Sequence, residues 1–194
     1  WGGVWWTLLL TLPGSLAFLV LFCGTIVLCK LLLLPTTPLG SAPLKSSMAV
    51  RRWLVDAMMK VSLLVVQPLY ASLFLPTWLR MLGAEIGARS EISTLDHISP
   101  DLLQIGEECF VADSVTLGAS GACNGWLYQD KAVIGDRTFL GNSAVIPAGS
   151  VLGNNCLIGV KSHPPCDFPD GVPDGTNWLG SPSVEMPQGA GQDD

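Results

Sequence analysis

Residues 134–160 read IGDRTFLGNSAVIPAGSVLGNNCLIGV, and an aliphatic side chain recurs there at every sixth position. The aliphatic residues are Ile134, Leu140, Ile146, Leu152 and Ile158, and glycine follows four of them. A 3.6-residue helix would spread these side chains around its axis, and simple β alternation would not fix their spacing at six. Short strands that turn by about 120° every six residues do produce this period, since three of them close one coil. The stretch therefore predicts a parallel β-helix.

The same period continues upstream of residue 134. The sets 86–92–98 and 105–111–117 keep the spacing, and one extra residue separates them. Coils of about eighteen residues then stack into about four turns over residues 83–162. The predicted columns are Ile86–Ile105–Ile134–Leu152, Ile92–Val111–Leu140–Ile158 and Ile98–Leu117–Ile146. To keep this register, residues 119–133 have to leave the β-helix as an extruded loop, and such excursions often carry function.

Charge divides the chain near residue 82. Residues 1–82 carry six basic side chains and one acid, whereas residues 83–194 carry four basic side chains and fifteen acids. Between Val4 and Leu34 the one charged residue is Lys30, and about 20 apolar residues suffice to span a bilayer. We therefore predict an integral membrane protein in which residues 1–82 contact membrane lipid and the soluble domain is cytoplasmic. Nothing clusters Lys and Arg in the soluble half, which argues against a nucleic acid partner.

A second apolar stretch, Val61–Leu79, allows two arrangements. It is apolar enough to cross the membrane, but a full crossing would place several basic residues opposite the soluble domain, against the positive-inside rule. Alternatively, residues 48–60 lie at the membrane surface, with their Arg and Lys side chains among the headgroups. The sequence leaves both arrangements open.

The remaining composition adds three expectations. The six cysteines lack CxxC spacing, so we expect reduced structural thiols. Residues 163–194 are expected to form a C-terminal extension and tail. The chain begins at Trp1 rather than Met, which predicts a piece of a longer protein.

Residues 86–158 resemble the hexapeptide-repeat acyltransferases, and residues 178–183 are similar to the terminal G-x-P-A segment of that family. The resemblance implies an all-β left-handed parallel β-helix, here preceded by an α-helical membrane segment. The handedness comes from the resemblance, because the usual crossover rule favours right-handed connections. The resemblance also implies thioester donors such as CoA, a catalytic histidine, and trimers with sites between neighbouring β-helices.

A closer resemblance extends into the membrane half. It is carried by WLVDAMMK (53–60), FLPTWLRMLGAEIGARSEIS (74–93), SPDLLQIGEECFVADSVTLGA (99–119), IGDRTFLGNSAVIPAG (134–149) and PDGTNWLGSPS (173–183). These runs look like the membrane-bound C-terminal region of nonribosomal-peptide-synthetase-like proteins of the poly-lysine-synthetase type. This implies upstream adenylation and carrier domains as partners, CoA or a carrier phosphopantetheine thioester as donor, and a trimer or tandem pseudo-trimer.

Acyl transfer from a thioester needs a general base, and histidine is the usual one near neutral pH. The chain has two histidines. His97 lies at a polar corner beside the one-residue break in the repeat, so we predict it as the base, with an idle surface histidine as the alternative. His163 follows the last coil in a Pro-rich loop, where a histidine without a functional role is commoner than a catalytic one. No metal is predicted, since the zinc hydratase site that a trimeric β-helix can carry needs three His ligands and the chain has two histidines.

Other polar and aromatic residues are weaker candidates. Asp113 and Asn142 stack in the predicted register, and we predict catalytic roles for them and a substrate-binding role for Ser143. The alternative is a solvated polar ladder on the β-helix surface. In the extruded loop, Trp126 and Tyr128 are predicted to line a substrate channel, with packing on the β-helix or the membrane as the alternative.

The sequence thus predicts a membrane-anchored, acyltransferase-like domain that transfers a thioester-activated acyl or aminoacyl group to an amine or alcohol. One rival is a non-catalytic scaffold that trimerises and docks the upstream domains at the membrane. Another is a degenerate member of a tandem set, whose active sites are completed by sibling units.

Overall fold

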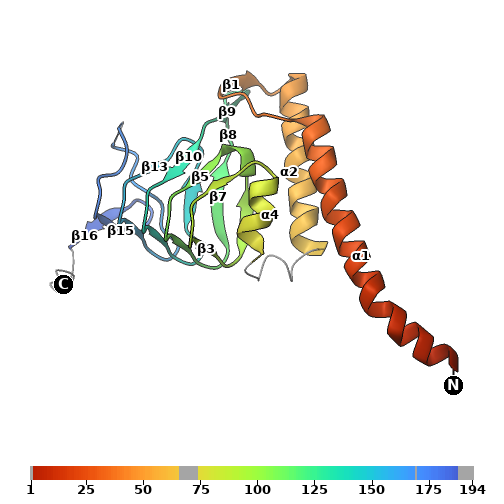
Figure 1. Cartoon of the computed structure of the whole chain (residues 1–194). Coiled ribbons are helices and arrows are strands. Elements are labelled where there is room, and N and C mark those ends of the chain that lie inside the picture. The colour runs from red at the N-terminus through yellow and green to blue at the C-terminus, as the bar shows by residue number, and fades with distance from the viewer. Residues whose placement is uncertain (1, 66–73, 169, 188–194) are drawn as a thin grey trace.

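The computed structural model describes residues 2–65, 74–168 and 170–187. Helices occupy the N-terminal part and short strands the remainder (Figure 1). The N-terminal elements are α1 (Gly2–Leu33), β1 (Gly40–Pro43), α2 (Ser47–Val65) and α4 (Leu75–Met81). Towards its N-terminal end α1 projects away from the body, whereas α2 and α4 lie close to the strands.

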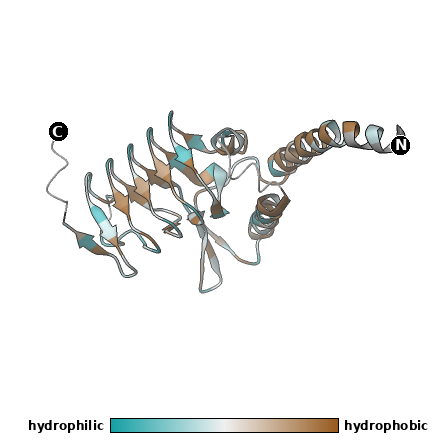
Figure 2. Ribbon diagram, turned by 90° about the horizontal axis from the view of Figure 1, so that it is seen from below, coloured by the Kyte–Doolittle hydropathy of each residue, from teal (hydrophilic) through white to brown (hydrophobic). Residues whose placement is uncertain are grey.

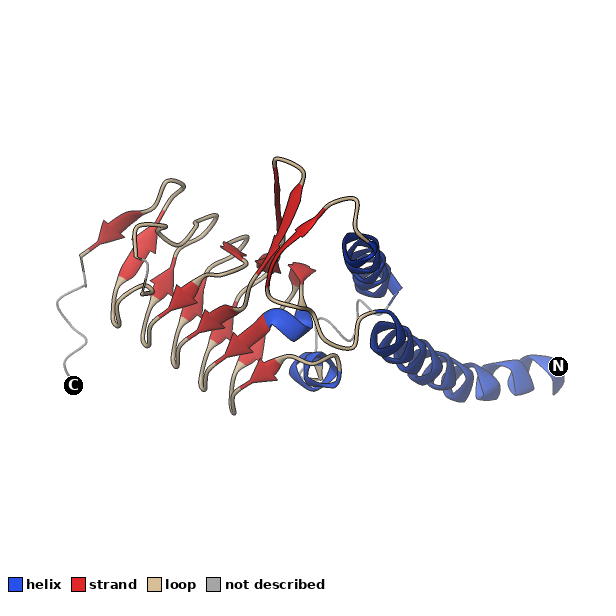
Figure 3. Cartoon of the chain, turned by 90° about the horizontal axis from the view of Figure 1, so that it is seen from above, coloured by secondary structure: helices blue, strands red, loops and turns tan. Residues whose placement is uncertain are grey.

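Parallel sheets form the β-helix, and each sheet supplies one face of every coil (Figure 3). The first contains β2 (Glu85–Ile86), β5 (Leu103–Ile105), β10 (Ala132–Ile134) and β13 (Val151–Leu152). The second contains β3 (Glu91–Ile92), β6 (Phe110–Val111), β11 (Phe139–Leu140), β14 (Leu157–Ile158) and β15 (Asn177–Leu179). The third contains β4 (Leu95–Ile98), β7 (Val115–Ala119) and β12 (Val145–Pro147).

The observed register confirms the three predicted columns. Ile105 pairs with Ile86 on one side and Ile134 on the other, and Ile134 pairs with Leu152. The other two columns pair in the same way across the second and third sheets. The column side chains are at most 5% exposed, apart from the half-buried Ile86. Because burying one such side chain stabilises the fold by about 1.5–3 kcal/mol, these columns form the core of the β-helix.

The β-helix continues beyond residue 162, where the sequence predicted only an extension. Val172 pairs with Leu152, and Trp178 of β15 pairs with Ile158 of β14. Two columns therefore gain one more level. β16 (Val184–Met186) then turns back and pairs antiparallel with β15.

At the N-terminal end, α4 covers the first coil. Pro76 lies in the first turn of α4, where a missing N–H is tolerated. The side chains of Leu75, Trp78 and Leu79 are at most 4% exposed, and α4 packs beside β2 and β3. A repeat scaffold needs such a cap, because an open first coil would expose its apolar interior. The predicted stretch Val61–Leu79 thus begins in α2 and ends in α4, while residues 66–73 lie outside the described residues.

The extruded loop is a β-hairpin that stands off the stack of strands (Figure 3). β8 (Gly121–Cys123) pairs antiparallel with β9 (Trp126–Gln129), and the turn residues Asn124 and Gly125 have φ angles of 49° and 82°. Asn-Gly is the preferred pair for such a turn, and this signal was present in the sequence. On its other edge β9 pairs antiparallel with β1, so the connection between α1 and α2 is fixed to the β-helix.

Among the described residues, α1 is the one helix long and apolar enough to cross a membrane, over Leu9–Leu33. Its projecting part is largely hydrophobic (Figure 2). α2 packs between α1 and β4, with the side chains of Val55 and Met59 buried. The opposite face of α2 is also apolar, because Trp53 is 67% exposed and Leu64 is 80% exposed.

The cysteines of the β-helix are expected to differ in reactivity. Cys109 and Cys156 are buried between coils, and burial raises the pKa of the Cys109 thiol, whereas Cys123 and Cys166 are exposed. Because the thiolate is the reactive form, brief iodoacetamide treatment at about pH 8 should alkylate the two exposed thiols first. Peptide mass spectrometry measures this order, and equally fast alkylation of Cys109 would contradict the packing described.

Candidate functional site

His97 lies on β4, on the side of the β-helix that α2 covers. A register shift between Leu95 and His97 brings His97 opposite Thr116 of β7. Bulges of this kind redirect a side chain and are common beside active sites. The His97 ring is half-buried, and its Nε2 atom is buried with no hydrogen-bond partner among the described residues. A neutral imidazole in this state has an acceptor available for a proton.

Burial is the main influence on the pKa of His97 and lowers it from the ordinary value of 6.5. The carboxylate of Asp56 on α2 acts in the opposite direction, and the positive charges of Arg52 and Lys60 on the same helix lower the pKa further. His97 is therefore neutral at about pH 7, which is the form a general base requires.

Acidification is expected to destabilise the fold through His97. In the unfolded chain His97 protonates near 6.5, whereas its folded pKa is lower, so below 6.5 the unfolded state binds more protons. The stabilising contribution is complete above 6.5 and is lost as the pH falls through the folded pKa. Thermal unfolding between about pH 7.5 and 5.5 should show a smaller dependence of Tm on pH in His97→Gln than in wild type. Equal slopes would show that His97 is not held neutral by the fold.

Close to His97, four charged side chains meet where α1, α2 and the turn after β4 join; three are buried and Asp56 is half-buried. They are Lys30, Arg52, Asp56 and Asp101. Arg52 is 1% exposed; its Nη2 lies 2.8 Å from Asp56 Oδ1 and its Nη1 lies 3.7 Å from Asp101 Oδ1. Lys30 Nζ lies 3.7 Å from Asp101 Oδ2. With two charges of each sign, this cluster is balanced in a region that water hardly reaches.

Sequence reasoning missed the charged cluster. The expectation that residues 48–60 direct their basic side chains to lipid headgroups is wrong for Arg52, which hydrogen-bonds Ser99 inside the protein. Asp101 lies in η1 (Pro100–Leu102), the short 3₁₀ turn at the one-residue break in the repeat. The available signal was Asp56, four residues after Arg52, since residues at that spacing share one face of a helix.

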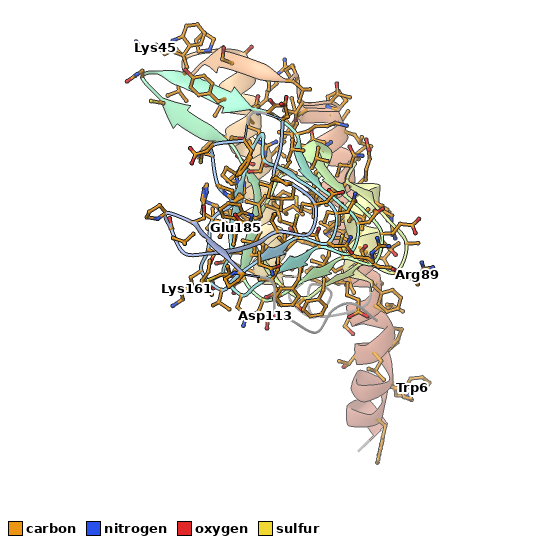
Figure 4. The ribbon with its side chains drawn as sticks, turned by 90° about the vertical axis from the view of Figure 1, so that its left-hand side faces the viewer. Trp6, Lys45, Arg89, Asp113, Lys161 and Glu185 are labelled. Carbon is orange, nitrogen blue, oxygen red and sulfur yellow. The ribbon has the colours of Figure 1, made fainter. Side chains whose placement is uncertain are left out.

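The polar candidates Asp113, Asn142 and Ser143 lie together at another corner of the β-helix. Thr94 Oγ1 donates to Asp113 Oδ1 at 3.1 Å, and the backbone N–H of Asp113 donates to Asn142 Oδ1 at 3.2 Å. Ser143 has a φ of 57° and its N–H donates to the carbonyl oxygen of Asp113. This corner and the hairpin region near Lys45 lie on opposite sides of the molecule in Figure 4.

The same hydrogen-bonding pattern occurs at a second corner, which favours a structural role for Asp113 and Asn142. There, Asp136, Asn154 and Asp174 each accept a hydrogen bond from a backbone N–H one coil away, at 2.7–2.8 Å. The side-chain oxygens thus satisfy backbone groups that the sharp corners leave unpaired. Thr116 pairs with His97, and Asp113 lies three residues before Thr116. Three residues span roughly 10 Å along a strand. The structure does not bring His97 and Asp113 together within one chain.

Trp126 and Tyr128 lie on the exposed face of β9, at 44% and 48% exposure, while Leu127 and Gln129 alternate inward. Tyr128 lines a hollow of about 460 Å³ at the base of the hairpin, between β9 and the corner at residues 147–149. The structure therefore places Tyr128, of the two predicted channel residues, at a cavity.

His163 lines two further hollows, of about 290 and 470 Å³, near the C-terminal end of the β-helix. Its Nδ1 lies 2.9 Å from the carbonyl oxygen of Pro164. The two histidines therefore occupy different sites, and His163 provides a matched control for changes at His97. Within the described ranges, no three His, Cys, Asp or Glu side chains gather in an arrangement that could hold a metal ion.

Comparison with known proteins identifies a relative that covers nearly the whole chain. The chain is 36% identical over 179 residues to a delta-poly-L-ornithine synthetase from Acinetobacter baumannii (strain AB307-0294). This match confirms the predicted resemblance to a poly(amino acid) synthetase. The aligned region covers 92% of this chain and 13% of the relative, so the chain corresponds to a small part of that protein.

The other comparisons carry less information. No family model matches the chain. A solved maltose O-acetyltransferase from Clostridium difficile 630 superimposes with a TM-score of 0.45 and 20% identity, over 55% of this chain and 59% of that one.

Proposed function

We propose that this chain is a membrane-anchored, acyltransferase-like domain with a left-handed β-helix, which transfers a thioester-activated acyl or aminoacyl group to an amine or alcohol. The observation that carries the proposal is His97, a neutral imidazole whose buried Nε2 has no partner among the described residues. The similarity to a poly-ornithine synthetase supports acyl chemistry on an amino group, because joining amino acids requires it.

In the proposed reaction, His97 Nε2 removes the proton from the acceptor amine or hydroxyl as it adds to the thioester carbonyl. The tetrahedral adduct then collapses, the carbon–sulfur bond breaks, and the imidazolium returns the proton to the leaving thiolate. The donor is CoA or the phosphopantetheine thioester of a carrier domain, supplied by upstream adenylation and carrier domains. Because Nε2 is buried beside α2, the acceptor can reach it only if α2 shifts away from β4.

Membrane anchoring is supported by the apolar surfaces of α1 and α2. Along α1, side chains such as Leu12 and Leu21 are more than 70% exposed, which distinguishes α1 from the buried core helix of a soluble protein. Trp53 and Leu64 give α2 an exposed apolar face as well. We propose that α1 crosses the membrane, that α2 contacts lipid, and that the β-helix is cytoplasmic.

A scaffold function is the second candidate, and one observation favours it. Phe110, Phe139 and Leu157 form an exposed apolar row on the outer face of the second sheet, with the two phenyl rings stacked at 5.5 Å. Such a row could pack against a neighbouring β-helix in a trimer or a tandem pseudo-trimer. In that case the domain would dock the upstream domains at the membrane without catalysing transfer.

The test uses the intact membrane protein with an acyl or aminoacyl group loaded on its carrier. Amines and alcohols are added, and both thioester loss and acylated acceptor are measured by mass spectrometry. The proposal predicts that thioester loss is matched by acylated acceptor. Thioester loss by hydrolysis alone, in a protein that still assembles normally, would favour the scaffold.

A further inference from the structure

The hollow at the base of the hairpin contains polar groups that the proposed reaction does not use. Gln129 of β9 lines it, is 2% exposed, and has no hydrogen-bond partner for Nε2 among the described residues. Ser120 lies between Ala119 and Gly121, two other lining residues, and its buried Oγ also has no partner there. Leaving a buried donor unsatisfied costs about 1–3 kcal/mol, so an acceptor supplied by a ligand in the hollow would stabilise the Gln129 amide.

Asp130 adds a negative charge to the rim of the hollow. Its Oδ1 accepts a hydrogen bond from the N–H of Lys131 at 2.8 Å. The neighbouring Lys131 Nζ is paired with Glu85 at 3.1 Å, and the ion pairs of the described residues do not include Asp130. Gly149, another lining residue, lies directly against Asp130, since a Cβ at Gly149 would lie 3.5 Å from Asp130 Cβ. The carboxylate is therefore free to take a cation at the rim.

We propose that this hollow binds an amine ligand that carries an amide or ester carbonyl, with its ammonium at Asp130 and its carbonyl at the Gln129 amide, after a rotation of the Gln129 side chain brings its buried Nε2 to the surface of the hollow. Tyr128, Pro147 and Ala148 supply the walls for the connecting methylene groups. The excess of acids over bases in residues 83–194 attracts such a cation to this half of the molecule.

The position of the hollow suits an acceptor site, and this part of the inference rests on the proposed function. Ala119, at its edge, is three residues along β7 from Thr116, which pairs with His97. That separation is about 10 Å. A ligand held by Asp130 and Gln129 could thus direct a more distant amine toward His97. Binding itself needs no transfer and is measured separately.

The test is calorimetric or NMR titration of the chain in detergent micelles with three ligands that share a primary amide and the same two-methylene spacer. β-Alaninamide carries an ammonium and an amide, butanamide carries the amide alone, and succinamate replaces the ammonium with a carboxylate. The expected order of affinity is β-alaninamide, butanamide, succinamate. Because Asp130 is exposed, Asp130→Asn should fold normally. It should lower the affinity for β-alaninamide by about tenfold and the affinity for butanamide by less than about twofold. Gln129→Met should lower the affinity for all three ligands.

The control is Glu91→Gln, which removes one negative charge from the outer face of the second sheet. It should leave all three affinities unchanged. Succinamate binding as tightly as β-alaninamide, or Asp130→Asn behaving like Glu91→Gln, would overturn the proposed site. Normal binding with no effect of His97→Ala on transfer would keep the site and remove only its role as an acceptor site.

Discussion

Replacing Arg52 with alanine is expected to lower the free energy of unfolding by about 3–5 kcal/mol. The guanidinium is 1% exposed and neutralises Asp56 at 2.8 Å and Asp101 at 3.7 Å. Without it, the buried carboxylate of Asp101 and the half-buried carboxylate of Asp56 would lose the cation that they share. The cost comes mainly from these uncompensated charges, because removing one partner of a buried pair is far more damaging than replacing the pair.

Arg51 provides the matched control for this substitution. It is the adjacent arginine on α2 and is exposed, so Arg51→Ala should change stability by no more than about 0.5 kcal/mol. Denaturant unfolding in a fixed detergent, followed by tryptophan fluorescence, compares the two variants. If Arg52→Ala were no more harmful than Arg51→Ala, this cluster would not contribute to the stability of the packing between the helices and the β-helix.

The core of the β-helix could be predicted from the sequence because its period is local. A six-residue spacing assigns each aliphatic side chain to one face, and stacking then fixes its partner one coil away. This is why Ile105, Val111 and Leu117 pair as predicted. The last level escaped prediction because Val172 and Trp178 follow a Pro-rich segment that interrupts the six-residue period.

The sequence indicates the turn of the hairpin, but not the pairing of the hairpin with β1. Asn124-Gly125 marks the turn between β8 and β9. β1 pairs with β9 from a position more than eighty residues earlier in the chain, as Gly40 with Gln129. Nothing in the short segment GSAP indicates that distant partner, because strand pairing over such separations depends on how the whole chain packs.

Of the candidate site, the sequence indicated the residue types but not their surroundings. The sequence indicates His97 through its corner position, whereas its neutral state depends on burial beneath α2. It indicates Asp113 and Asn142 as polar residues in register, and their hydrogen bonds to neighbouring coils favour a structural role. Charges buried by tertiary packing, such as Arg52, cannot be distinguished from exposed ones by their local sequence.

Replacing His97 with alanine is expected to reduce acyl transfer by about 10²–10⁴-fold. The loss follows from removing the proposed general base, which accepts the proton of an attacking amine. Without it, the amine adds to the thioester while still carrying that proton, or waits for water to remove it. In the proposed function the upstream domains load the thioester, so loading should be unchanged. His163→Ala, at the other end of the β-helix, should retain near-normal transfer.

The most direct measurement is single-turnover transfer in the intact membrane protein, preloaded on its carrier with a labelled aminoacyl thioester. Product formation after addition of an amine is followed in wild type, His97→Ala and His163→Ala. The proposal predicts equal loading in all three and a loss of at least about a hundredfold in His97→Ala alone. Equal transfer rates in wild type and His97→Ala would contradict a base at this position and leave the domain as a scaffold.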